Sequence, residues 1–276
     1  MDNRTTDRPA FIFRQGSEPL LISMPHVGTY IPPSLAARMV DEARHVADTD
    51  WHLETLYDFA DELGASVIIA THSRYVIDLN RPADGTSLYP GQSVTGLCPV
   101  DMFDGAQIYL PGEAPDKNEI ARRREAIWQP YHDKLSAELT RIKAEHGVAG
   151  LWDAHSIRSV LPRFFEGKLP DLNFGTADGR SCDEKMAHAI LEIAQAAAQD
   201  GFTHILNGRF KGGYITRHYG NPSDNIHAIQ LEMAQSCYMQ EALPFGYIPS
   251  AAARVQPYIR KMIETMLVFL KARQSR

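Results

Sequence analysis

The chain has 276 residues, of which 44% are hydrophobic and 22% charged, and its net charge is −6. This is a globular composition, and we expect one domain over residues 1–276. The acidic balance argues against nucleic acid as the partner. The N-terminal segment MDNRTTDRPA lacks the apolar core of a signal peptide, and no apolar run approaches the roughly 18 residues of a membrane span, so we expect a cytoplasmic protein without a membrane partner. Three widely spaced cysteines predict neither a disulfide framework nor a CxxC metal site.

Apolar spacing and β-branched runs predict the order of the elements. In chain order we expect strands over 11–14 and 19–23, a helix over 48–63, strands over 65–70 and 74–79, a helix over 117–145 that bends near Pro130, a strand over 148–153, a helix over 183–199, a strand over 227–233 and a helix over 252–272. The connecting segments 80–116, 156–180 and 207–220 are expected to be loops, the last a glycine-broken loop or hairpin. Alternating strands and helices predict an α/β fold, a three-layer sandwich around a mixed, mostly parallel sheet.

Four apolar runs end in chemically reactive side chains. These are His26 after PLLIS, Asn80-Arg81 after VIDL, His155 after GLWD, and Glu232 after AIQL. An ordinary strand exit into a polar loop explains any one of them. In open α/β sheets, however, ligands bind beyond the carboxyl ends of strands, and all four side chains suit metal or anion chemistry. The coincidence favours one functional site.

Two histidines and a carboxylate from separate loops are the ligands of a catalytic zinc site. We expect His26 and His155 to bind Zn²⁺, or Co²⁺ or Mn²⁺ in its place. The segment DTDWH (48–52) offers the third ligand. Its first residues can cap the predicted helix, which leaves Asp50 as the preferred ligand and His52 and Asp153 as alternatives. Asp153 is better placed to orient an imidazole.

The remaining polar residues suggest a hydrolase acting on an anionic substrate. Glu232 would be costly to bury without a partner beside Leu231 and Met233, and it is the candidate general base. A serine nucleophile is disfavoured because no GxSxG motif is present. Two basic clusters in an acidic chain suggest a small-molecule substrate with two carboxylates; they contain Arg74, Asn80 and Arg81, and Arg209, Lys211 and Arg217.

Six motifs together carry a family resemblance. SMPHVG, DTDWH, SRYVIDLNRP, LWDAHSIRS, NGRFKGGYITRHYGNP and IQLEMAQ, from about residue 19 to about residue 240, closely resemble the N-formylglutamate amidohydrolases, or N-formylglutamate deformylases. More distantly, the set is similar to zinc carboxypeptidases and to acylglutamate and acylaspartate deacylases, which implies a zinc-carboxypeptidase-like fold. Carboxypeptidases have an acidic ligand three residues after the first histidine, where this chain has Thr29. Asp50 is the expected replacement.

The resemblance implies metal-dependent hydrolysis of N-formyl-L-glutamate to L-glutamate and formate, the last step of a histidine-degradation route. It implies that Asn80 and Arg81 bind a substrate carboxylate and that Glu232 is the base. Arg74 would stabilise the oxyanion, and Arg209 and Arg217 would help to bind the substrate. The 82–116 segment is expected to close over the site. The alternatives are a deacylase of another N-acyl amino acid and a non-catalytic dicarboxylate-binding protein.

Overall fold

A seven-stranded sheet runs through the molecule. The computed structural model describes residues 8–87, 91 and 94–274. The strands lie in the order β1-β3-β2-β4-β7-β5-β6. Only the β1–β3 and β7–β5 pairs are antiparallel, so the sheet is mixed and mostly parallel, as predicted. Their bounds are β1 Phe11–Arg14, β2 Leu20–Met24, β3 Ser66–Ala70, β4 Ala149–Ile157, β5 Leu172–Gly175, β6 His204–Leu206 and β7 Ile226–Ala234.

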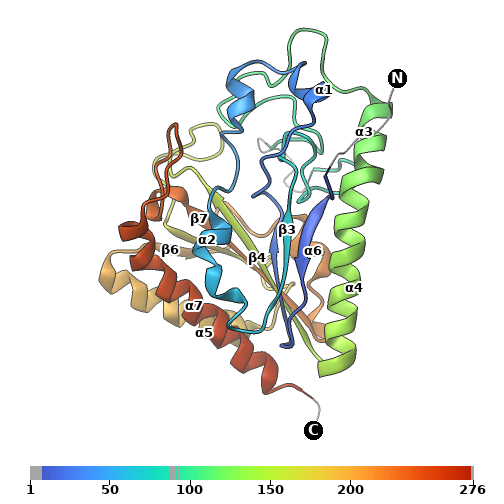
Figure 1. Cartoon of the computed structure of the whole chain (residues 1–276). Coiled ribbons are helices and arrows are strands. Elements are labelled where there is room, and N and C mark those ends of the chain that lie inside the picture. Colours follow the sequence, from blue (N-terminus) through green and yellow to red (C-terminus); the bar gives the residue numbers. More distant parts are fainter. Residues whose placement is uncertain (1–7, 88–90, 92–93, 275–276) are drawn as a thin grey trace.

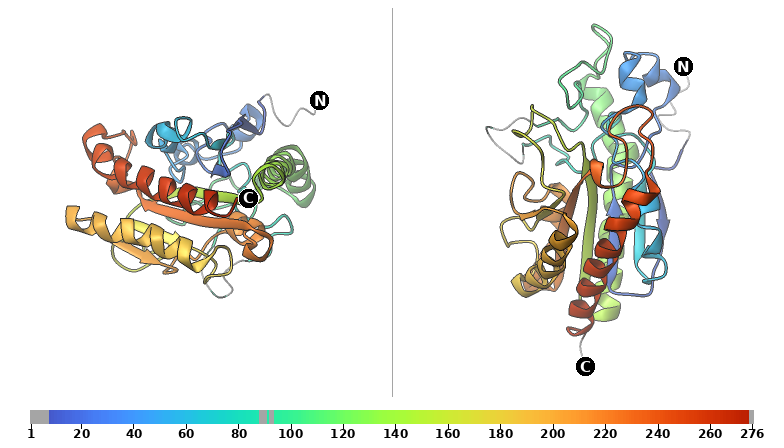
Figure 2. Two further views of the ribbon diagram at one scale, coloured as in Figure 1. Left: turned by 90° about the horizontal axis from the view of Figure 1, so that it is seen from below. Right: turned by 90° about the vertical axis from the view of Figure 1, so that its left-hand side faces the viewer.

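Helices cover both faces of this sheet (Figures 1 and 2). The core on one face joins the sheet to α4 and α6, and the core on the other joins it to α2, α5 and α7. This arrangement confirms the three-layer α/β sandwich. The helices are α1 Pro33–Ala36, α2 Leu53–Leu56, α3 Lys117–Arg123, α4 Gln129–His146, α5 Glu184–Ala197, α6 Tyr214–Tyr219 and α7 Pro249–Lys271. None of the helices among the described residues has the length and apolarity to cross a bilayer.

Strand alternation on β4 separates apolar from polar chemistry. Trp152 and Ala154 pack into the core under α5 and α7. Asp153 and His155 point to the opposite face, where Asp153 Oδ2 accepts a hydrogen bond from the Thr216 hydroxyl of α6 (3.2 Å). β4 is longer than predicted, so His155 lies inside the strand rather than after it. The polar face of a buried strand is therefore available to build a site.

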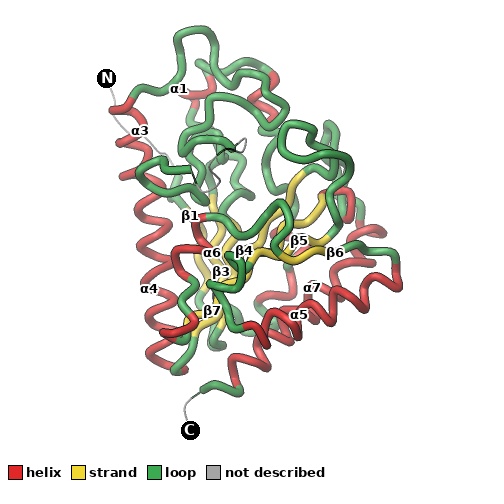
Figure 3. The backbone as a smooth tube through the Cα atoms, turned by 180° about the vertical axis from the view of Figure 1, so that it is seen from behind, coloured by secondary structure: helices red, strands yellow, loops and turns green. Residues whose placement is uncertain are grey.

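The parallel strands β2, β4 and β7 are neighbours, and their carboxyl ends meet at one edge of the sheet. Long loops gather beyond this edge, above the strands in Figure 3. His26 follows β2, while His155 and Glu232 lie opposite each other in the register of β4 and β7. The strand order thus brings together three residues that are far apart in sequence.

The helix predicted over 48–63 is wrong for most of its length. Only α2 and a 3-10 turn over Asp58–Ala60 are helical, and His52, just before α2, has a left-handed backbone (φ 62°). The preceding turn is held by a long-range bond, since the Asp50 N–H donates to the His26 carbonyl (3.0 Å). Tertiary hydrogen bonds override the helical spacing of the apolar residues here.

The strand predicted over 74–79 is also wrong, because this segment forms successive turns. Its side chains are buried, which explains the apolar composition. Arg74 Nη2 donates to Asp78 Oδ2 (2.7 Å), and Asp78 Oδ1 accepts the Asn80 N–H (2.9 Å). The Val76 N–H donates to the Ser73 carbonyl (2.8 Å) and the Asp78 N–H to the Leu97 carbonyl (2.7 Å), so a turn and a long-range bond replace the ladder of a strand.

The irregularity predicted near Pro130 in the 117–145 helix is present: a π-helical turn over Arg124–Trp128 joins α3 to α4, and it brings the Trp128 indole N–H to the Arg81 carbonyl (3.0 Å). Two loop predictions need correction. The 156–180 segment contains β5, and 207–220 is a loop followed by α6, with no hairpin. β5 and β6, of four and three residues, are too short to show alternation in the sequence.

Candidate active site

Three buried side chains converge at the carboxyl end of β2 and β4. The ligand atoms that His26, Asp50 and His155 offer all lie within 4.8 Å of one another. Asp50 Oδ2 is 3.1 Å from His155 Nδ1 and 3.6 Å from His26 Nδ1. The sequence prediction of these three residues as one cluster therefore matches their placement in the fold.

The second nitrogen of each imidazole has its own polar partner. His26 Nε2 lies 2.7 Å from Asp78 Oδ1. His155 Nε2 lies 2.9 Å from Asn80 Nδ2 and 3.2 Å from Asp153 Oδ2. Metal-binding histidines commonly donate the N–H of the other ring nitrogen to a carboxylate in this way. Both Nδ1 atoms are left facing Asp50.

The donor set and its charges fit a divalent cation. Asp50 Oδ1 is buried and has no hydrogen-bond partner among the described residues. Burial would raise the pKa of Asp50, but its contacts with His155 and His26 lower it below the usual range, so the carboxylate is ionised. Two imidazole nitrogens and one carboxylate form a ligand set that suits Zn²⁺ and related divalent metals.

The alternatives for the third ligand lie elsewhere. His52 Nε2 is bonded to the Phe245 carbonyl (2.6 Å), outside the cluster. Asp153 is on the Nε2 side of His155. Burial alone would lower the pKa of the His155 imidazole, but the Asp153 and Asp50 carboxylates together outweigh this effect and the pKa is raised. The geometry thus favours Asp50 as ligand and Asp153 as the group that orients His155.

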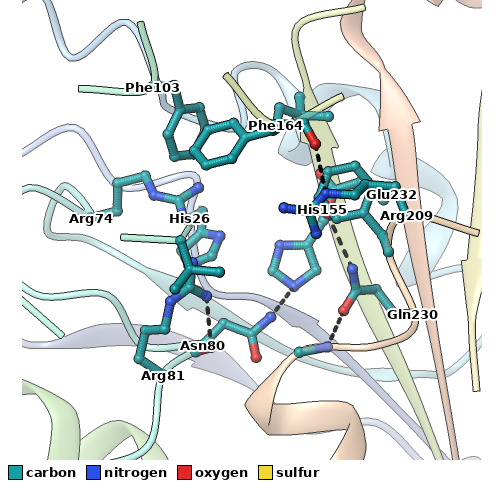
Figure 4. A pocket seen from close by; sticks show the side chains of 14 residues that line it. His26, Arg74, Asn80, Arg81, Phe103, His155, Phe164, Arg209, Gln230 and Glu232 are labelled. Carbon is teal, nitrogen blue, oxygen red and sulfur yellow. Dashed lines mark hydrogen bonds between the residues drawn. The ribbon is translucent and has the colours of Figure 1, made fainter. Parts of the chain in front are cut away.

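A cavity opens beside this cluster (Figure 4). Glu232, on β7, lines it and is 8% exposed. Burial raises the pKa of Glu232 to about 8; the His155 imidazole opposes this shift, and the Asp50 carboxylate adds to it. A carboxyl group with a raised pKa beside a metal-type cluster suits proton transfer. The lining also includes His26, Arg74, Asn80, Arg81, Val94, Phe103, His155, Ile157, Phe164, Arg209, Phe210, Gly213 and Gln230.

Arg74 is a buried cation that lines the cavity. Its Nη2 atom is 2.7 Å from Asp78 Oδ2, and its Nη1 atom is 3.8 Å from Asp50 Oδ1. The guanidinium carbon lies 4.5 Å from the centre of the Phe103 ring. Arg74 is therefore held by fixed negative charge and an aromatic face, and its position cannot relax freely.

Two of the other predicted arginines line the cavity, and one does not. Arg81 donates from Nε to the Thr95 carbonyl (2.9 Å), and Arg209 donates from Nε to the Phe164 carbonyl (2.8 Å). Arg217 lies on α6, donates to the Gly212 carbonyl (2.7 Å) and is not among the described lining residues. Lys211 pairs with Asp178 at the surface (3.0 Å).

The 82–116 segment contributes Val94 and Phe103 to the cavity wall. Part of the predicted covering segment, residues 88–90 and 92–93, lies outside the described residues. The closing movement expected of this segment stays a prediction.

Sequence reasoning missed several residues that build the site. Asp78, which holds His26, is four residues from Arg74 within SRYVIDLNRP, and this spacing was the available signal. Gln230 precedes Glu232 by two residues, so strand alternation places both on the same face. The aromatic wall of Phe103, Phe164 and Phe210 had no signal, because it comes from three loops that only the fold brings together.

The sequence is similar to known proteins over nearly its whole length. The family model for N-formylglutamate amidohydrolase matches residues 18–239. The N-formylglutamate deformylase of Pseudomonas aeruginosa is 52% identical over 263 residues, which are 95% of this chain and 98% of that protein. The N-formylglutamate deformylase of Pseudomonas putida is 49% identical, with 96% and 98% covered.

Two solved structures share the fold. The N-formylglutamate amidohydrolase from Ralstonia eutropha JMP134 has a TM-score of 0.79 at 21% identity, with 96% of this chain and 98% of that chain covered. A gene product from Agrobacterium tumefaciens has a TM-score of 0.71 at 18% identity, with 96% and 97% covered. The chain belongs to the N-formylglutamate amidohydrolase family and is a hydrolase that acts on an amide.

Proposed function

We propose that this protein hydrolyses N-formyl-L-glutamate to L-glutamate and formate, as one catalytic domain in the cytoplasm, at the end of a histidine-degradation route. The observation that carries the proposal is the cluster of His26, Asp50 and His155 next to a cavity that Glu232 and several arginines line. The identity to two proteins named N-formylglutamate deformylase supports the choice of substrate.

His26, Asp50 and His155 would hold the metal, with Zn²⁺ as the proposed ion and Co²⁺ or Mn²⁺ as substitutes. When bound, such an ion acts as a Lewis acid and lowers the pKa of water toward neutrality. Asp78 and Asp153 orient the two imidazoles through their Nε2 atoms. The remaining steps fall to side chains of this chain.

Glu232 is the proposed general base. Its carboxylate takes a proton from the attacking water as the water oxygen adds to the formyl carbon. The same carboxyl group then delivers that proton to the amide nitrogen and the C–N bond breaks, which gives formic acid and the amine of glutamate; the acid proton passes to the amine, so formate and the ammonium form of glutamate are released. Arg74, which lines the cavity, would stabilise the negative charge that develops on the formyl oxygen.

The substrate carboxylates are assigned to the cationic side of the cavity. Arg81 and Arg209 are the proposed partners, because a guanidinium matches the two oxygens of a carboxylate. Asn80 joins them: its Oδ1 is held by the Ile215 N–H, which leaves the two N–H donors of its amide on the cavity side, where one can bind substrate. A role for Arg217 stays a prediction. The aromatic wall would limit the acyl group to a small one.

Replacing Arg209 by Leu should raise KM for N-formyl-L-glutamate by about 10- to 100-fold with a smaller change in kcat, because a charged hydrogen bond of about 1.5–3 kcal/mol is lost. Steady-state kinetics measures this. Arg254→Leu is the matched control, since Arg254 also donates to a carbonyl and lies over a phenylalanine ring, but on α7. An unchanged KM in R209L would remove Arg209 from the substrate site.

The substrate assignment is tested by turnover of three compounds. We expect kcat/KM for N-formyl-L-glutamate to exceed that for N-formyl-L-aspartate and N-acetyl-L-glutamate by at least about 10-fold. The side chain of the aspartate compound is one carbon shorter, which moves its carboxylate away from its partner. The acetyl group is one carbon larger than formyl, which crowds the acyl end of the cavity. Equal or faster hydrolysis of another N-acyl amino acid would replace the proposed substrate. Binding of the dicarboxylate without any hydrolysis would indicate a binding protein.

A further inference from the structure

Gln230 is a buried amide that the proposed chemistry does not yet use. It lies on β7 two residues before Glu232, is 3% exposed and lines the cavity. Its Nε2 donates to Glu232 Oε2 (3.1 Å), as Figure 4 shows. Within the described part of the chain, this is the one hydrogen bond that the Glu232 carboxylate receives from a side chain.

The orientation of the Gln230 amide is set from its other end. Gln230 Oε1 accepts the N–H of Gly213 (2.7 Å), the residue before α6. A backbone N–H at this point has no acceptor within its own helix, so it needs an outside partner. With Oε1 held there, the NH2 group must face Glu232. Gly213 can approach so closely because it lacks a Cβ, which would lie 2.2 Å from Asn80 Nδ2.

Asn80, on the other side of Gly213, repeats the same arrangement. Its Oδ1 accepts the N–H of Ile215 (2.8 Å), and its Nδ2 lies 2.9 Å from His155 Nε2. The start of α6 therefore fixes two amides, and each turns its NH2 group to a residue of the site. The repetition indicates a scaffold for the site rather than an isolated polar contact.

We propose that Gln230 is a positioning residue that fixes the Glu232 carboxylate through this hydrogen bond. The inference rests on the proposed function, in which Glu232 is the base. The bond occupies Oε2 and restricts rotation of the carboxylate, so that Oε1 is presented to the attacking water. Without it, Glu232 samples other rotamers in the cavity, and small displacements of a proton-transfer group cost about 10²-fold in rate.

The test compares Gln230→Met with Gln230→Asn in the full chain. Methionine keeps the length but makes neither bond; asparagine keeps the amide but is too short to reach both Gly213 and Glu232. We expect either change to lower kcat for N-formyl-L-glutamate by about 10- to 100-fold, with KM changed by less than about 3-fold. Gln256→Met on α7, whose amide bonds the Leu56 carbonyl, should leave kcat unchanged.

A double-mutant cycle separates positioning from a general loss of structure. If Gln230 acts through Glu232, Gln230→Met should lower kcat by less than about 3-fold when Glu232→Gln is already present. The full loss repeated in that background would overturn the inference. So would a wild-type kcat in both Gln230 variants, or a raised KM with kcat retained. Should Gln230→Met not fold, Gln230→Asn runs the same cycle.

The proposed function fails separately from this inference. A wild-type protein that releases no product from any N-acyl amino acid would overturn the role of Glu232, and with it the inference. A wild-type protein that is active while both Gln230 variants match it would overturn the inference alone.

Discussion

Glu232→Gln is expected to lower kcat by about 10²- to 10⁴-fold, the usual contribution of a positioned general base. Glutamine has nearly the same shape, but its amide cannot take a proton from water or return one to the leaving nitrogen. The loss corresponds to about 3–5 kcal/mol of barrier. Because Glu232 is not one of the three clustered ligands, metal content should stay at the wild-type level. Steady-state formate release and elemental analysis measure the two quantities.

Glu138→Gln is the matched control for this substitution. Glu138 is also a buried glutamate, but it lies on α4 and bonds Ser66 (2.6 Å) and Arg141 (2.7 Å), away from the cavity. We expect its kcat to stay within about 3-fold of wild type. A Glu232→Gln protein that retains wild-type kcat would contradict the assignment of the base.

His155→Ala is expected to lower both metal content and kcat/KM, the latter by about 10³-fold or more. Removing one of the three proposed ligands would open the site and would also free Asp50 and Asp153, which both lie within 3.2 Å of the ring. Metal that binds only the folded state raises Tm. We therefore expect zinc to raise the Tm of wild type but not that of His155→Ala.

His227→Ala tests whether any buried histidine of the sheet would have the same effect. His227 is on β7 at the opposite end of the sheet, where its Nδ1 accepts the Asp183 N–H (3.1 Å). Its metal content and its zinc-dependent Tm shift should match wild type. Equal metal content in His155→Ala and wild type would move the metal to other residues.

The sheet was predictable where burial and strand geometry agree. Residues 20–24, 66–70 and 226–234 form apolar runs that are buried almost throughout, and they are strands. The run 74–79 has a similar composition but folds as turns, in which the Val76 N–H donates to the Ser73 carbonyl and the Asp78 N–H to the Leu97 carbonyl. The apolar pattern records burial, and it cannot show whether the backbone is bonded in a ladder or in turns.

The site was predictable where parallel strands carry its residues. Three site residues lie on or just after parallel strands: His26 after β2, His155 on β4 and Glu232 on β7. The sequence predicts that they meet, because the carboxyl ends of neighbouring parallel strands lie at the same edge of the sheet. Asp50 reaches them through the Asp50–His26 backbone bond, which no local pattern reveals. The sequence therefore left His52 as an alternative; in the structure that ring lies outside the cluster and is bonded to the Phe245 carbonyl.

Whether the protein is a metal-dependent deformylase is decided by formate release from N-formyl-L-glutamate, using protein stripped with a chelator and then resupplied with Zn²⁺, Co²⁺ or Mn²⁺. We expect the activity to fall by at least about 100-fold on stripping and to recover with at least one of these ions. We also expect that no ion restores activity to His155→Ala. Full activity in protein shown to be free of metal, or no formate release with any ion, would contradict a metal-dependent deformylase.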